Sequence, residues 1–340
     1  MDSPHPRAGG PQRRRRFSSA DKLAHLAAYE QACATNDGGA FLRREGLYSS
    51  LISEWRKQRD AGVLTGKPAG KVGAHERLSG AWNFRDVAET ASLRPGRLFR
   101  SSELSSLDDA GRATLTELGV TDVADLRSPG EVARRGGGGV PSGVAVHNLP
   151  FPEVTQTHGD DGHAEAPHES SFQKLMAEFS EEDPTVAARR WMTGEYERFP
   201  TLGGARTAVR RIITMLADGH PVLVHCFAGK DRTGFAVAVA LEAAGVAPDE
   251  ILADYLRSND AAGRLRDSIL ATMRSREGIT DEVVSFAESR LTDEVLGVRA
   301  EYLAAARRVL DDTHGGLPGF LAAARVTEDD VARLRTQLLG

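Results

Sequence analysis

The chain has 340 residues, 40% of them hydrophobic, which is enough for one large domain or two and excludes a wholly disordered protein. Its two cysteines, Cys33 and Cys226, lie far apart in the sequence, which argues against a disulfide framework and makes a reducing compartment, the cytoplasm, the default location. The formal net charge of −5 is unevenly divided. Residues 1–74 carry 13 Lys/Arg and 7 Asp/Glu, whereas residues 75–340 carry 30 and 41. This imbalance suggests different partners or origins for the two parts.

The sequence has no feature of a membrane span or a cleavable signal peptide. Arg13 to Arg16 form a basic run, but no apolar region follows it. No apolar run reaches the length of about 18 residues that a membrane-spanning helix needs. We therefore expect neither a signal peptide nor a transmembrane segment.

The N-terminal part of the chain has the pattern of a small helical segment. Residues 1–12 are rich in Pro and Gly without periodicity, which predicts a disordered tail. Within residues 13–62, helices are predicted over 18–34, 40–45 and 51–59, separated by glycine-containing turns. This is an all-α helix-turn-helix pattern in which the third helix is the candidate recognition helix.

Residues 42–50, which read LRREGLYSS, resemble the N-terminal DNA-binding region of insertion-sequence transposases. The likeness is confined to residues 13–62 and ends before any catalytic part of a transposase. Two interpretations stay open. The segment binds nucleic acid through its basic residues, or it is a fusion relic whose basic run is a solvated tail. Residues 63–74, which are rich in Gly, follow as a flexible linker.

The second domain, residues 75–340, begins as a succession of strands and helices. A short strand after the turn at 94–96, a helix over 107–118 and a buried-type strand over 121–126 predict a parallel α/β sheet. Asp125 and Arg127 lie at the end of this last strand. Arg127 either faces an anion site or pairs with a neighbouring carboxylate.

A third strand, over 144–149, precedes the run Pro-Phe-Pro-Glu that ends at Glu153. Residues 157–170 then contain three histidines among several acidic residues. Their spacing matches no zinc pattern, so we expect a solvated insertion and no metal site.

The most informative stretch is His225 to Gly234, HCFAGKDRTG, between the apolar run 221–224 and a helix-like run over 235–244. In a strand, loop and helix of this kind, backbone N–H groups and the positive end of the helix converge on a phosphate. Arg232 adds a bidentate guanidinium. The same field favours the thiolate of Cys226, which is then a nucleophile aimed at phosphorus.

At these residues the chain resembles the cysteine-dependent phosphatases, and most closely the bacterial tyrosine phosphatase family whose loop reads HCxxGKDRTG. The likeness extends to NFRD at 83–86, RPGRLFRSSEL at 94–104 and DLRS at 125–128, so it covers nearly all of the second domain. It implies an α/β fold with a parallel sheet flanked by helices. It also implies hydrolysis of phosphotyrosine through a cysteinyl-phosphate, without metal or organic cofactor, and substrates that are phosphoproteins or phosphoinositides.

The resemblance also implies roles for single residues. Cys226 is the nucleophile, Arg232 stabilises the transferring phosphoryl group, and His225 orients the loop. Asp125 and Arg127 support it. The residues that bind the phosphate are Phe227, Ala228, Gly229, Lys230, Asp231, Arg232 and Thr233. Lys230 brings a second positive charge, from which a ring with several phosphates would gain.

Two acidic residues compete for the role of general acid. A carboxylate inside an anion cradle is unfavourable unless it is catalytic or protonated, which makes Asp231 the leading candidate. Alternatively, Asp231 only orients Lys230 or Arg232. Glu153 is the rival, because relatives carry Asp in the corresponding Phe-Pro-Asp run.

Amphipathic segments over 265–273 and 281–291 follow the loop. They form either a helical lid within residues 262–292, as in mycobacterial members of the family, or ordinary core. The alternative function is a DNA-binding protein with an inactive phosphatase-like scaffold, against which the presence of Cys226, Asp231 and Arg232 argues. Some relatives act outside the bacterium without a cleavable signal. The resemblance therefore leaves export without a signal peptide open as an alternative to the cytoplasm. The sequence does not define the oligomeric state.

Overall fold

The chain forms two compact units, Met1–Lys71 and Val72–Gly340. The structure is a computed structural model, and it describes residues 22, 25, 26, 29, 30, 32, 33, 38–45, 52, 53, 55–57, 78–151, 183–275 and 280–340. The predicted tail at 1–12, the linker at 63–74, Glu153 and the histidine-containing segment at 157–170 lie outside these residues.

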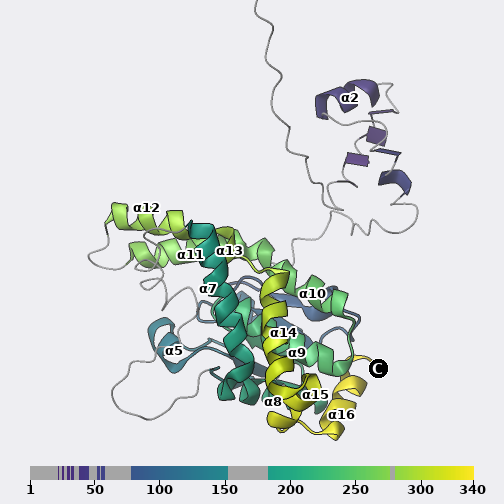
Figure 1. The fold of residues 1–340 in the computed structure, drawn as a ribbon, viewed down its shortest axis with the longest axis vertical. Helices are drawn as coiled ribbons and strands as arrows, with labels where there is room; N and C mark the ends of the chain where they lie inside the picture. Colours follow the sequence, from purple (N-terminus) through teal and green to yellow (C-terminus); the bar gives the residue numbers. More distant parts are fainter. Residues whose placement is uncertain are drawn as a thin grey trace, which may run out of the picture. The chain divides into compact units, whose positions relative to one another are not determined.

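The first unit contains helix α2 (Gly38–Glu45), drawn in purple in Figure 1, where the sequence predicts a helix over 40–45. Apolar side chains form a small core beside it, those of Leu26, Phe41, Ile52 and Trp55. The helix-turn-helix arrangement of residues 13–62, its likeness to transposases and its binding of nucleic acid stay predictions.

The second unit is built on a five-stranded sheet with the strand order β1-β2-β5-β3-β4. The strands are β1 (Arg85–Asp86), β2 (Leu98–Ser101), β3 (Asp122–Asp125), β4 (Ala145–Asn148) and β5 (Val222–His225). The predicted parallel sheet is confirmed for β2 to β5. Only the short edge strand β1, which sequence analysis did not predict, pairs antiparallel, with β2. The sheet is therefore mixed.

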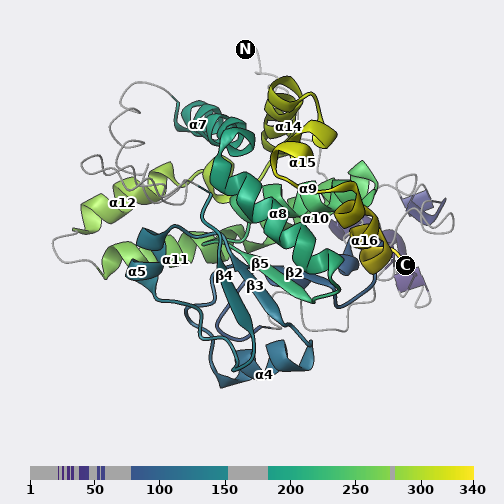
Figure 2. The same cartoon turned by 90° about the horizontal axis from the view of Figure 1, so that it is seen from below.

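The three central strands β2, β3 and β5 are buried along their whole length because apolar layers cover both faces of the sheet. Successive side chains of a strand point to opposite faces. Leu98, Ala124, Val222 and Val224 accordingly pack in one core, and Phe99, Val123 and Leu223 pack in another. Figure 2 shows α4 (Asp109–Glu117) on one side of the sheet and α8 (Gly203–Ala217) on the other.

The remaining helices surround this sheet. None of the helices that the structure describes is both long enough and apolar enough to span a membrane. The other α-helices among the described residues of the second unit are α5 (Pro129–Arg135), α7 (Pro184–Arg198), α9 (Asp231–Ala244), α10 (Pro248–Leu256), α11 (Ala262–Arg274), α12 (Asp281–Arg290), α13 (Asp293–Leu296), α14 (Ala300–His314), α15 (Leu317–Ala323) and α16 (Glu328–Leu338).

Strand β5 lies between β2 and β3, and its last residue, His225, is level with Ser101 of β2 and Asp125 of β3. The loop that follows β5 therefore starts at the carboxyl edge of three parallel strands. Crevices at this edge are where open α/β sheets bind their ligands.

Candidate active site

The loop predicted to bind phosphate runs from Cys226 to Lys230 between β5 and the first turn of α9. Gly229 has a φ of +66°, and a Cβ at this position would lie 2.1 Å from the carbonyl oxygen of Ser101. Only glycine fits so tight a left-handed turn against β2. Within the described part of the chain, the backbone N–H groups of Ala228, Gly229 and Lys230 donate to no other protein group. They are thus available to an anion.

Arg232 is held in place by a carboxylate that sequence analysis missed. Its Nη1 and Nη2 each donate to one oxygen of Glu131, at 2.7 Å, and both side chains are buried. Burial acts to raise the pKa of Glu131, but the Arg232 guanidinium and the hydrogen bonds from Ser128 together outweigh it and lower that pKa. The pair is therefore fully charged. Glu131 closes a capping box with Ser128 at the start of α5. The Ser-Pro-Gly-Glu run at 128–131, shortly after β3, was a signal for this capping box but not for the ion pair with Arg232.

Four buried side-chain atoms have no hydrogen-bond partner among the described residues, and two of them lie in the first turn of α9, Nε of Arg232 and Oγ1 of Thr233. The other two are Nε of Arg100 and Oγ1 of Thr292. Buried polar atoms are almost always hydrogen-bonded, so unpaired donors of this kind mark a place where a ligand supplies the acceptors. Cys226, six residues before Arg232 in the chain, is 2% exposed. The site thus joins a thiol to donors that fit phosphate oxygens.

Asp231 lies in a buried network rather than in open solvent. Its Oδ1 accepts hydrogen bonds from the Tyr196 hydroxyl at 3.0 Å and from Nζ of Lys230 at 2.9 Å. The Tyr255 hydroxyl donates in turn to that of Tyr196, at 2.7 Å. Burial, followed by the charge of Asp231, raises the pKa of Tyr196 well above its usual value, so its phenol stays protonated and donates. Sequence analysis singled out neither tyrosine, because only the fold brings α7 and α10 to the loop.

Lys230 is buried as well, and its Nζ also donates to the carbonyl oxygen of Gly297 at 3.2 Å. Its charge therefore lies against Asp231 rather than at the surface. This contact agrees with the alternative in which Asp231 orients Lys230, and it does not exclude a catalytic role for Asp231.

Asp125, Arg127 and His225 lie together beneath the loop. Of the two interpretations of Arg127, the structure shows carboxylate pairing, with Nη2 at 2.7 Å from Asp125 and Nη1 at 3.0 Å from Glu103. Nδ1 of His225 lies 3.8 Å from Asp125 and 3.2 Å from the carbonyl oxygen of Cys226. Burial lowers the pKa of His225, so the ring is neutral at neutral pH. A neutral ring in this position suits the expected orienting role.

The outer side of the loop is covered by apolar side chains. Phe227 and Ala228 pack with residues of the two segments after the loop, Leu265, Ile269 and Leu270 of α11 and Val284 of α12, together with Leu291 and Leu296. The Arg135 guanidinium lies 3.9 Å above the ring of Phe227. Both segments are helices, and their buried apolar residues share one apolar cluster with Phe227 and Ala228. We call these residues of α11 and α12 the cover of the loop, and their role as a lid stays a prediction.

The described residues include no group of three or more His, Cys, Asp or Glu side chains arranged to hold a metal ion. Glu153 lies outside the described residues, so its candidacy as general acid stays a prediction.

Comparison with known proteins places this site in a family. The model of the "Tyrosine phosphatase family" matches residues 76–340. The chain is 56% identical over 278 residues to the triple specificity protein phosphatase PtpB of Mycobacterium tuberculosis, an alignment that covers 78% of this chain and 100% of that protein. A relative from Cupriavidus necator is 32% identical over 76% of this chain and 86% of its own length. The tyrosine-protein phosphatase of Nostoc commune is 28% identical over 75% of this chain and 78% of its own.

Proposed function

Because the chain belongs to the tyrosine phosphatase family, we propose that it hydrolyses phosphotyrosine through a cysteinyl-phosphate formed on Cys226. The observation that carries this proposal is the pair of unpartnered buried donors, Nε of Arg232 and Oγ1 of Thr233, in the first turn of α9, which directly follows the loop with the thiol. Together with the N–H groups of Ala228 to Lys230, they supply the hydrogen-bond donors that a phosphate dianion requires.

In the first step, Sγ of Cys226 attacks phosphorus in line. The S–P bond forms and the P–O bond to the tyrosine breaks, while a carboxylic acid protonates the departing oxygen. Arg232 and the loop N–H groups hold the equatorial oxygens as their charge redistributes, and each such preorganised donor is worth about 2.7–4 kcal/mol of barrier. The ion pair with Glu131 fixes the Arg232 guanidinium before substrate arrives.

In the second step, water attacks phosphorus and the S–P bond breaks. The same carboxylate takes the proton from water, inorganic phosphate leaves, and the hydroxyl of Thr233 donates a hydrogen bond to the released thiolate. Thiolate chemistry needs reducing surroundings, so the cytoplasm remains the predicted location.

Asp231 is our candidate for this carboxylate. Tyr196 and Lys230 both donate to its Oδ1, which fixes the carboxyl group next to the loop. We expect Asp231→Asn to reduce kcat/KM, which reports the steps up to release of the leaving group, much more on a phosphotyrosine peptide than on p-nitrophenyl phosphate, because p-nitrophenolate leaves with little help from an acid. Glu153→Gln provides the matched comparison. Equal losses on both substrates in Asp231→Asn would leave Asp231 with an orienting role only.

The breadth of substrates is a further part of the proposal. The relative from Mycobacterium tuberculosis is named a triple specificity protein phosphatase. We propose that this chain likewise accepts phosphoserine and phosphothreonine beside phosphotyrosine, and also phosphoinositides, whose additional phosphates would engage Lys230. To do so, Nζ of Lys230 must leave the carbonyl oxygen of Gly297. Lys230→Ala should then lower kcat/KM more on a phosphatidylinositol monophosphate than on p-nitrophenyl phosphate, and equal losses would remove the argument.

The test of the proposed function is hydrolysis of p-nitrophenyl phosphate by the full-length protein and by Cys226→Ser, with reductant and a metal chelator present. We expect chelator-resistant turnover that falls by about 10³-fold or more in Cys226→Ser. Turnover that survives in Cys226→Ser would contradict the thiolate mechanism.

A further inference from the structure

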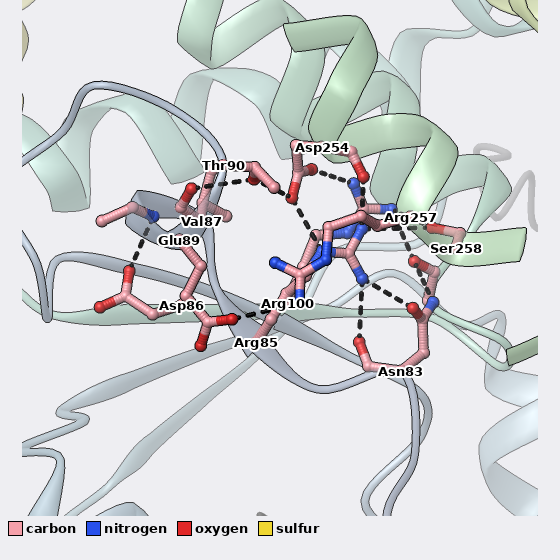
Figure 3. Close-up of polar contacts among 12 residues, drawn as sticks. Asn83, Arg85, Asp86, Val87, Glu89, Thr90, Arg100, Asp254, Arg257 and Ser258 are labelled. Carbon is pink, nitrogen blue, oxygen red and sulfur yellow. Dashed lines mark hydrogen bonds and ion pairs between the residues drawn. The ribbon is translucent and has the colours of Figure 1, made fainter. Parts of the chain in front are cut away.

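A buried polar cluster, drawn in Figure 3, donates hydrogen bonds to carbonyl groups of the loop, and the phosphoryl-transfer steps above do not use it. Its side chains are those of Asn83, Arg85, Arg100, Asp254 and Ser258, each at most 2% exposed. Arg85 and Arg100 come from β1 and β2, Asp254 from α10, and Asn83 from the segment before β1. The cluster thus joins two family-like runs, NFRD and RPGRLFRSSEL, to the carboxyl half of the fold.

Two members of the cluster bind the backbone of the loop itself. Nδ2 of Asn83 donates to the carbonyl oxygens of Ala228, at 3.0 Å, and Gly229, at 3.1 Å. Nη2 of Arg100 donates to the same oxygen of Gly229, at 2.7 Å. Two consecutive carbonyl groups of the loop are therefore held from below by side-chain donors.

These hydrogen bonds to the carbonyl groups determine where the neighbouring N–H groups point. In a planar trans peptide, the C=O of one residue and the N–H of the next face opposite sides. Holding the carbonyl groups of Ala228 and Gly229 downward therefore turns the N–H groups of Gly229 and Lys230 to the other side. Those are the groups that have no protein acceptor among the described residues.

The donors are themselves fixed by an ion-pair network. Asp254 accepts from Nε of Arg85 at 2.8 Å and from Nη1 of Arg100 at 2.6 Å. Nη1 of Arg85 donates to Oδ1 of Asn83 at 2.7 Å, which leaves the Asn83 amide nitrogen directed at the loop. Both side chains that bind the loop carbonyl groups, Asn83 and Arg100, are thus oriented by another side chain of the cluster.

The charges of the cluster suit an anion above it. Burial acts to raise the pKa of Asp254, but Arg100 and Arg85 lower it to about 2. Burial and the charge of Arg100 lower the pKa of Arg85 to about 10. At neutral pH, two guanidinium groups therefore face one carboxylate, and the excess positive charge lies beneath the phosphate cradle.

We propose that Asn83 and Arg100, held by Arg85 and Asp254, are positioning residues that aim the N–H groups of Gly229 and Lys230 at the substrate phosphate. This inference rests on the proposed function, since it concerns the same loop. It assigns to the cluster the task of setting the affinity of the loop for phosphate oxygens.

Asn83→Gly is the cleanest variant. Asn83 has a φ of +54°, which glycine adopts without strain, so the change removes only the amide group. Arg85 keeps its hydrogen bond to the backbone oxygen of residue 83, at 3.2 Å. Arg100→Lys is the second variant, because it keeps the positive charge but cannot bind Asp254 and Gly229 together. Leu334→Ala, in the buried face of α16, is the control for lost stability.

For each full-length variant, the experiment measures the thermal midpoint of unfolding and, below that midpoint, kcat, KM and the affinity for inorganic phosphate. The affinity is measured by calorimetry. We expect Asn83→Gly and Arg100→Lys to weaken phosphate binding about tenfold or more and to lower kcat by about 10²-fold. Leu334→Ala should change neither, although its midpoint falls. Folded Asn83→Gly or Arg100→Lys with phosphate affinity and kcat within about twofold of the unmutated protein would overturn the proposal.

The two proposals fail in different ways. If Cys226→Ser retains turnover, the thiolate mechanism fails whatever the Asn83 variant does. If Cys226→Ser is inactive while Asn83→Gly and Arg100→Lys behave like the unmutated protein, only the positioning role fails.

Discussion

The two sides of the phosphate-binding loop are stabilised by different interactions, hydrogen bonds on one side and apolar packing on the other. Below it, charged and polar side chains bind its carbonyl groups in fixed directions, through Asn83 and Arg100. Above it, apolar residues of α11 and α12 pack on Phe227 and Ala228. Hydrogen bonds are directional, whereas apolar packing depends chiefly on the area removed from water. The polar cluster of Asn83, Arg85, Arg100 and Asp254 is therefore suited to fix the loop geometry, and we expect a change in the apolar cover to leave that geometry intact.

The largest effect should come from removing Asp254, the carboxylate at the centre of the polar cluster. Asp254→Ala leaves the two buried guanidinium groups of Arg85 and Arg100 without their carboxylate. Removing one partner of a buried ion pair costs about 3–5 kcal/mol. We expect a fall of this size in the free energy of unfolding, measured in urea, together with loss of turnover. A variant as stable as the unmutated protein would mean that the ion pairs of Asp254 do not stabilise this part of the fold.

The same carboxylate should be visible in the pH dependence of stability. The folded pKa of Asp254, about 2, lies below the usual value of 3.8. Its contribution is therefore fully present above about pH 4 and is lost as the pH falls toward 2, and it amounts to about 2 kcal/mol. Urea unfolding of the unmutated protein and of Asp254→Asn across this range should give free energies that converge as the pH falls. A constant difference would contradict this assignment.

Loosening the cover should act on access more than on geometry. Ile269→Ala removes apolar contact between α11 and the loop, where Ile269 is 8% exposed. Because Cys226 is 2% exposed, alkylation of its thiol by iodoacetamide should become several-fold faster, whereas the affinity for inorganic phosphate should stay within about twofold. Phe286→Ala, on the exposed face of α12, is the matched control. Equal alkylation rates in all three proteins would show that α11 and α12 do not limit access.

A further effect concerns Asp231, the candidate general acid. Tyr196→Phe removes one of the two donors to Asp231, and a hydrogen bond to a charged group is worth about 1.5–3 kcal/mol. We expect kcat on a phosphotyrosine peptide to fall about tenfold, with KM little changed. Tyr255→Phe, which loses only the hydrogen bond to Tyr196, should have a smaller effect. A larger loss of kcat in Tyr255→Phe than in Tyr196→Phe would mean that the hydrogen bond from Tyr196 to Asp231 is not the contact that supports catalysis.

Much of the loop could be predicted from its own sequence, because strand, glycine turn and helix N-terminus are local features. The cysteine, the arginine and the buried strand before them lie within a dozen residues, and the structure joins them as expected. The parallel core of the sheet followed in the same way from alternating strands and helices. The two-residue strand β1 was too short to leave a pattern.

The partners of the loop could not be predicted, because they are distant in the sequence. Glu131 lies about a hundred residues before Arg232, and Tyr196 reaches Asp231 from a helix whose sequence reads as ordinary core. The run NFRD was noticed only as a likeness. Its physical meaning appeared when the fold placed Asn83 against Ala228 and Gly229.

The most direct test of the account is to trap the intermediate. Full-length Asp231→Asn, mixed with p-nitrophenyl phosphate and quenched in acid, should carry one phosphoryl group on the peptide that contains Cys226, because attack on this substrate needs little acid whereas water requires a base. The double variant with Cys226→Ser should carry none. Turnover of the unmutated protein without any phosphoryl group on Cys226 in the trapped enzyme would contradict the cysteinyl-phosphate mechanism.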